Sequence, residues 1–118
     1  MEKQKILIAD DSEMNRALLV DILEDQYDIV EADNGAAAID LLTQCGGDFS
    51  LLLLDIMMPE MDGFEVLAYI NRYHLNDTLA VIMISADDSP ANIKRAYDLG
   101  AFDYISRPFD AAIVRRRI

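Results

Sequence analysis

Disulfide partners and long apolar runs are missing from this sequence, and each absence narrows what the protein can be. The single cysteine, Cys45, cannot form an internal disulfide, which suits a reducing compartment. The apolar runs at 6–9, 51–54 and 80–84 are far shorter than the roughly 20 residues that cross a bilayer. Residues 1–5 lack the apolar segment of a signal peptide. We therefore expect a cytoplasmic protein that does not enter the membrane.

Basic residues are also scarce. The chain has 10 lysine and arginine residues against 22 acidic ones, which gives a net charge of −12. Such a surface repels nucleic acid and anionic lipid, so we expect no direct nucleic-acid binding and no membrane contact. The one basic cluster, at 115–117, suits the C-terminal half of a helix, where cations complement the helix dipole.

The 118 residues fit one domain, and their apolar pattern predicts its class. Short apolar runs alternate five times with stretches of helical period. The expected strands are 5–9, 28–32, 51–54, 80–84 and 102–105, and the expected helices are 13–25, 34–45, 63–73, 90–99 and one from Phe109 onward. This alternation predicts an α/β fold, a doubly wound (βα)5 three-layer sandwich. Its parallel five-stranded sheet is expected in the flavodoxin-like order 2-1-3-4-5, with the second strand at an edge.

Capping residues mark two of the helix starts. Asp62 can cap the helix at 63–73, and Ser89 stands before Pro90, which suits the first helical position. The residues expected on the inner face of the helix at 63–73 are Phe64, Leu67 and Ala68.

The residues that can carry chemistry gather where the strands end. Those at or after the carboxyl ends of the first, third, fourth and fifth strands are Asp10, Asp11, Asp55, Ser85, Ser106 and Arg107. In a doubly wound sheet, sites form at these ends, at the switch point between strands 1 and 3. Three acids, a hydroxyl and a cation are therefore expected to meet at one edge of the sheet.

The three aspartates give the strongest signal. Two like charges about 4 Å apart cost about 4 kcal/mol at an effective dielectric of 20, so some feature must offset their repulsion. One carboxylate could stay protonated. A hard divalent cation, Mg²⁺ or Mn²⁺, is the better answer, because carboxylates and backbone carbonyls are its preferred ligands. The plainer alternative is that Asp10 and Asp11 cap the first helix.

Asp55 is the best candidate nucleophile. It follows four apolar residues, so a strand buried on both faces would hold it rigidly. Phosphoryl transfer then needs mainly positioning and charge stabilisation. Ser85, one strand over, can donate a hydrogen bond to a phosphate oxygen. Arg107, about 10 Å away by strand spacing, can reach the same phosphate with its long side chain.

Four stretches together carry a family resemblance. They are ILIADD at 6–11, LLDIMMPEMDG at 53–63, VIMISA at 81–86 and GAFDYISRPF at 100–109. They resemble the response-regulator receiver domain of two-component signalling, including the chemotaxis regulators, and the match covers essentially the whole chain. The resemblance implies a regulatory domain, not a turnover enzyme, in which Asp55 accepts a phosphoryl group from a histidine kinase or phosphotransfer protein. It also implies the N-terminal part of a longer regulator that controls an output domain or partner.

The resemblance assigns further site residues. Those that would hold Mg²⁺ are Asp10, Asp11, Asp55 and, through its backbone carbonyl, Met57. Ser85 and Arg107 would bind the phosphate. As the switch, Ser85 would move toward the phosphate and Tyr104 would swing inward. That motion would remodel the face of the fourth helix, fifth strand and fifth helix, which partners read and which is also a plausible homodimer surface.

Arg107 departs from the family pattern, which has lysine at this position. A degenerate receiver that acts as a phosphorylation-independent binding module is therefore the alternative function. Two other classes fit less well. A haloacid-dehalogenase-like phosphatase requires a second acidic residue two positions after its nucleophile, and Met57 occupies that position here. A flavodoxin-like FMN carrier needs a phosphate loop after the first strand, where Asp10 and Asp11 would repel the phosphate.

The Arg107→Lys variant tests the departure. We expect the natural arginine to support phosphorylation of Asp55 with altered kinetics. Arginine is larger than lysine, is planar and binds oxyanions through two parallel hydrogen bonds. The rate of phosphorylation and the Mg²⁺ affinity of the variant are compared with those of the parent chain. Equal values for both quantities would show that the departure is neutral.

Overall fold

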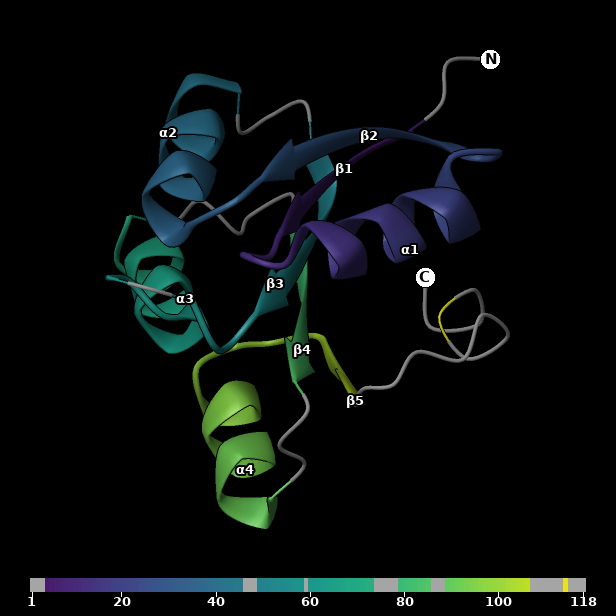
Figure 1. Cartoon of the computed structure of the whole chain (residues 1–118). Coiled ribbons are helices and arrows are strands. Elements are labelled where there is room, and N and C mark those ends of the chain that lie inside the picture. The colour runs from purple at the N-terminus through teal and green to yellow at the C-terminus, as the bar shows by residue number, and fades with distance from the viewer. Residues whose placement is uncertain are drawn as a thin grey trace.

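The computed structural model describes residues 4–45, 49–58, 60–73, 79–85, 89–106 and 114. Strands and helices alternate along these residues (Figure 1). The elements are β1 (Gln4–Ala9), α1 (Glu13–Leu23), β2 (Tyr27–Ala32), α2 (Gly35–Cys45), β3 (Phe49–Asp55), α3 (Gly63–Arg72), β4 (Ala80–Ser85), α4 (Pro90–Asp98) and β5 (Asp103–Ser106). The predicted fifth helix lies outside the described residues, except for Val114. None of the described helices is long and apolar enough to cross a membrane.

The five strands form one parallel sheet in the order β2-β1-β3-β4-β5. This order confirms the prediction, including the place of β2 at an edge. After β2 the chain crosses back over β1 to add β3 on its other side. The carboxyl ends of β1 and β3 are therefore neighbours at the point where the direction of sheet growth reverses, which is where doubly wound folds place their sites.

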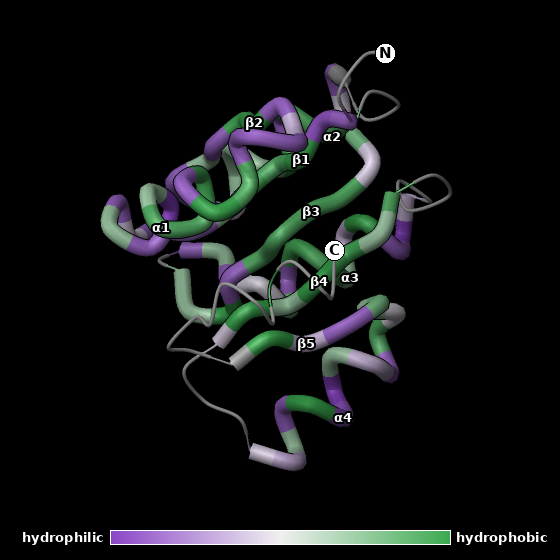
Figure 2. The backbone as a smooth tube through the Cα atoms, turned by 90° about the vertical axis from the view of Figure 1, so that its right-hand side faces the viewer, coloured by the Kyte–Doolittle hydropathy of each residue, from purple (hydrophilic) through white to green (hydrophobic). Residues whose placement is uncertain are grey.

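Each face of the sheet has its own hydrophobic core. Leu52 and its neighbours in register pack with α2, α3 and α4, whereas Leu53 and its neighbours pack with α1. Figure 1 shows α2 and α3 on one side of the sheet and α1 on the other. In Figure 2, β3 and β4 run through the centre as hydrophobic segments. Full burial of each such leucine or isoleucine stabilises the fold by about 1.5–3 kcal/mol, so the strands that carry the site are anchored in the core.

Side-chain caps start all four of the described helices, including α2, where the Ala37 N–H donates to the Asn34 side-chain oxygen at 2.7 Å. The hydroxyl of Ser12 accepts a hydrogen bond from the Asn15 N–H at 3.3 Å at the start of α1. Asp62 caps α3 and Ser89 caps α4, as predicted. The fourth helix, expected at 90–99, ends at Asp98, and Gly100 follows it with a φ of 96°. A residue with a side chain rarely adopts that conformation.

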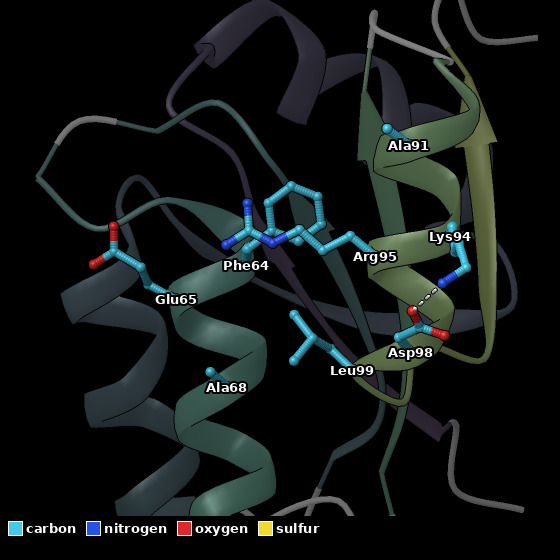
Figure 3. A pocket seen from close by; sticks show the side chains of 8 residues that line it. All are labelled: Phe64, Glu65, Ala68, Ala91, Lys94, Arg95, Asp98 and Leu99. Atoms are coloured by element: carbon cyan, nitrogen blue, oxygen red, sulfur yellow. Dashed lines mark hydrogen bonds and ion pairs between the residues drawn. The ribbon is translucent and has the colours of Figure 1, made fainter.

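Several local predictions were wrong. α1 ends at Leu23, two residues before the predicted end, and β3 begins at Phe49, two residues before the predicted start. Phe64 and Leu67 are buried as predicted, but Ala68 is exposed, because the buried stripe of α3 consists of residues 63, 64, 66, 67 and 70 and Ala68 lies at its edge, one turn after Phe64. Instead, Ala68 lines a hollow of about 530 Å³ between α3 and α4 (Figure 3). The fifth strand begins at Asp103, one residue later than expected, and Phe102 before it is 70% exposed. Pairing with β4, which matches Ile82 to Asp103, sets this start.

Gly63 lets the loop after β3 return to the strand it left. Its N–H donates to the carbonyl of Ile56 at 2.8 Å. A Cβ at this position would collide with the backbone oxygen of Asp55 and lie 2.8 Å from the Cα of Ile56. Because both obstacles are backbone atoms, no side-chain rotation relieves the clash. Glycine at this position therefore lets α3 begin directly against the end of β3.

The Gly63→Ala variant tests this close approach. We expect it to lower the free energy of unfolding by about 1–3 kcal/mol, because the added methyl group forces the two backbone segments apart. Urea denaturation measures the change. Ala68→Ser is the control, since it also adds one heavy atom to α3 but at an exposed position. If both variants lost the same small amount of unfolding free energy, the close approach of α3 to the end of β3 would be contradicted.

Candidate functional site

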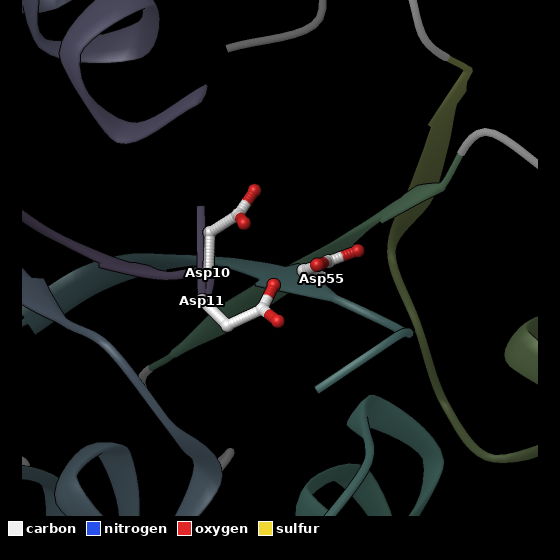
Figure 4. Close-up of side chains that lie close together, drawn as sticks. All are labelled: Asp10, Asp11 and Asp55. Carbon is white, nitrogen blue, oxygen red and sulfur yellow. The ribbon is translucent and has the colours of Figure 1, made fainter. Parts of the chain in front are cut away.

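The ends of β1 and β3 bring three carboxylates together. Ala9 pairs with Leu54 in the sheet, so the residues that follow them end at the same level on neighbouring strands. Oxygen atoms from Asp10, Asp11 and Asp55 all lie within 4.8 Å of one another. Figure 4 shows the three side chains converging on one small space.

The cluster concentrates negative charge in a poorly hydrated place. Asp10 and Asp55 are each 1% exposed, and Asp11 is exposed. Each pair of charges about 4 Å apart costs about 4 kcal/mol at an effective dielectric of 20, and burial increases that cost. An arrangement of this kind favours a bound cation.

Helix capping does not account for the two consecutive aspartates. The N-cap of α1 is Ser12, so neither aspartate occupies that position. One carboxylate oxygen of Asp10 accepts a hydrogen bond from the Ser12 N–H at 2.8 Å, which turns the chain from β1 toward α1. The alternative that both aspartates serve as helix caps is therefore wrong for Asp11. For Asp10, the observed local role is to form the turn before α1.

The spacing of the carboxylates fits Mg²⁺. At a metal–oxygen distance of about 2.1 Å, neighbouring ligands of an octahedral ion are about 3.0 Å apart and opposite ligands about 4.2 Å. Among three ligands at most one pair can be opposite, so the oxygen atoms, which lie within 4.8 Å of one another, would close by up to about 1.8 Å around such an ion, a movement within reach of side-chain rotation. The donor set consists entirely of oxygen atoms, which is the chemistry that Mg²⁺ and Mn²⁺ prefer.

Local backbone structure orients Asp55. It is the last residue of β3, and the next residue, Ile56, still donates its N–H to Ile84 in β4 at 3.1 Å. The Met57 N–H donates to a carboxylate oxygen of Asp55 at 3.3 Å. Met57 is 70% exposed, and the contact that it makes with the cluster is through its backbone N–H.

The predicted switch residues lie on the neighbouring strands. Ser85 ends β4 with a fully buried side chain, and it pairs in register with Ser106, the last residue of β5. Tyr104 is 6% exposed and belongs to the core that faces α2, α3 and α4. Its N–H donates to the Asp103 carboxylate at 2.8 Å. Arg107 lies outside the described residues, so its reach to the cluster stays a prediction.

Arg16, in α1, touches the site although the sequence did not single it out. Its Nη1 donates to the backbone carbonyl of Asp10 at 2.6 Å. One feature of the sequence could have identified Arg16 as a site residue. It lies about one turn into the helix that follows two consecutive aspartates. That signal is weak without the structure, because most arginines on amphipathic helices face solvent.

Known proteins match this chain along its length. A family model described as the response regulator receiver domain matches residues 6–118. The chemotaxis protein CheY of Halobacterium salinarum is 36% identical over 110 residues, which cover 92% of this chain and 88% of that protein. A probable cyclic di-GMP phosphodiesterase of Vibrio cholerae is 35% identical over 113 residues, 96% of this chain but 25% of the relative.

The structural comparison agrees. The structure of the CheX-CheY-BeF3-Mg+2 complex from Borrelia burgdorferi has a TM-score of 0.90 and 31% identity, and the match covers 96% of this chain and 84% of that one. This chain spans between a quarter and half of the length of several curated relatives. Because the family model covers nearly all residues and the sheet order and helix placement agree with it, this chain belongs to the family of response regulator receiver domains.

Proposed function

We propose that this receiver domain is a phosphorylation-dependent signalling switch whose phosphoacceptor is Asp55. The observation that carries the proposal is the convergence of three carboxylates, two of them buried, at the switch point of the sheet. Asp55 is the member at the end of a strand that is buried on both faces, which favours it as the nucleophile. The proposed residues around it are Asp10, Asp11 and the Met57 carbonyl for Mg²⁺, and Ser85 and Arg107 for the phosphate.

The chemistry follows from the charges. An Asp55 carboxylate oxygen would form a bond to phosphorus while the phosphorus–nitrogen bond of a phosphohistidine breaks, and the imidazole leaves. When bound, Mg²⁺ supplies the positive charge that offsets the repulsion between the acids and the incoming phosphoryl group. Asp10 and Asp11 would hold it, and the Met57 N–H fixes the orientation of the attacking carboxylate.

The proposed partners follow from the family. A cytoplasmic histidine kinase or phosphotransfer protein would donate the phosphoryl group. The receiver would be the N-terminal part of a longer regulator and would act on an output domain or a partner protein. The length of several relatives, of which this chain matches half or less, supports this division. The face formed by α4, β5 and the predicted fifth helix would transmit the signal and could support a homodimer.

The proposed switch couples Ser85 to Tyr104. Ser85 would move toward the phosphate, and Tyr104 would occupy the space beside it. In this structure the Tyr104 ring is already buried. The proposal therefore requires that an outward position of the ring is populated when Asp55 carries no phosphate.

Intact mass measurement tests the phosphoacceptor. Incubation with a small-molecule phosphodonor and Mg²⁺ is expected to add one phosphoryl group to the chain. The addition should disappear in Asp55→Asn and in the presence of a chelator. Asp21→Asn, which removes an exposed aspartate of α1, is the matched control and should retain it. If no condition adds mass, the phosphorylation-independent binding module becomes the preferred function.

Thermal unfolding tests the metal site separately. A tenfold excess of Mg²⁺ over its dissociation constant should stabilise the parent chain by about 1.4 kcal/mol. Asp55→Asn should lose this gain. In chelator, the same variant should melt above the parent chain, because it lacks one of the mutually repelling buried charges. A variant that melts below the parent in chelator would contradict the electrostatic account of the cluster.

A further inference from the structure

Arg16 connects three elements at the edge of the acid cluster. Its Nη1 donates to the backbone carbonyl of Asp10 at 2.6 Å, and its Nε donates to a carboxylate oxygen of Glu31, in β2, at 3.1 Å. The Arg16 side chain is 15% exposed, so it is largely enclosed by the groups it binds. α1, the end of β1 and the edge strand are thus joined through one guanidinium.

These contacts hold Asp10 from both sides. Its N–H donates to the carbonyl of Ala32, the last residue of β2, at 3.1 Å, and its own carbonyl accepts from Arg16. One oxygen of its carboxylate accepts from the Ser12 N–H. The backbone of Asp10 follows the last residue of β1 and lies outside the sheet pairing, so these bonds take over from the strand in fixing it.

We infer that Arg16 is a positioning residue, which holds Asp10 in place for the divalent cation, and that Glu31 neutralises the Arg16 charge that would otherwise oppose the cation. The inference rests on the proposed function, because it concerns the proposed Mg²⁺ site. Arg16 donates to a carbonyl and does not contact the ion. Its effect acts through Asp10.

Charge and geometry predict opposite results when Arg16 is removed. If the positive charge dominates, its loss reduces repulsion and Mg²⁺ binds more tightly. If positioning dominates, the end of β1 loosens and Mg²⁺ binds more weakly. Groups that orient metal ligands typically contribute about 10–100-fold to affinity. Glu31 already offsets the charge of Arg16, so we expect positioning to dominate.

The experiment measures Mg²⁺ affinity of the whole chain by titration calorimetry, with Mg²⁺ alone as the probe. Arg16→Met should weaken binding about tenfold. The Mg²⁺ affinity of Arg16→Lys should lie between that of this variant and that of the parent. An ammonium group keeps the charge, but it cannot donate to the Asp10 carbonyl and to Glu31 with the geometry of a guanidinium. Arg72→Met, at the opposite end of α3 from the site, removes the same charge and should leave the affinity within about twofold. If Arg16→Met is not folded by circular dichroism, Arg16→Lys carries the test.

Glu31→Gln separates the two parts of the inference. Its amide oxygen can still accept from Arg16, so the geometry remains while the charge of Arg16 is no longer offset. We expect Mg²⁺ to bind about two- to threefold more weakly at low salt and normally at high salt. The loss in Arg16→Met should persist at high salt, because it is geometric.

Unchanged or tighter Mg²⁺ binding in Arg16→Met, with normal binding by the parent, would overturn the inference and leave the proposed function intact. A loss in Arg16→Met no larger than that in Arg72→Met would overturn it too, since the bond from Arg16 to the Asp10 carbonyl would then contribute nothing to Mg²⁺ affinity. Absence of Mg²⁺ binding by the parent chain would instead overturn the proposed metal site, and with it the inference.

Discussion

The site depends on the repulsion among three carboxylates that the sheet order forces together. β1 and β3 are neighbours although β2 lies between them in the sequence, so their carboxyl ends bring Asp10, Asp11 and Asp55 within 4.8 Å. Two half-cores, one on each face of the sheet, hold the strands and prevent the acids from relaxing apart. The fold therefore maintains an unfavourable electrostatic arrangement, and a bound cation is the natural way to relieve it.

Several of the interactions that support the cluster use groups other than its carboxylates. Ser12 caps α1, so that task does not fall to an aspartate. Arg16 fixes the chain at Asp10 through a carbonyl and not through the carboxylate. Gly63 brings α3 against the end of β3 by backbone contact, without a side chain in the way. In each case the supporting bond involves a group that neither a metal ion nor a phosphate would need.

The sequence was sufficient for features that depend on local pattern. The caps Asp62 and Ser89 follow from capping chemistry, and the alternation of apolar runs with helical stretches indicates a doubly wound sheet, whose common strand order places β2 at an edge. It was insufficient where distant segments decide the outcome. Arg16 and Glu31 are 15 positions apart and meet because β2 folds back beside β1. Ala68 was misplaced because a small apolar residue fits either a core or a surface, and only the phase of the α3 stripe separates the two.

The edge position of β2 has a consequence for solubility. A strand at the rim of a sheet offers unpaired backbone groups to any other extended chain, and such rims can seed aggregation. β2 carries the exposed acids Asp28 and Glu31 along this rim. A second copy aligned against it would place like charges opposite one another and would have to separate Glu31 from its arginine. The rim therefore resists self-association into ribbons, because both the charges and the bond between Arg16 and Glu31 oppose a second strand there.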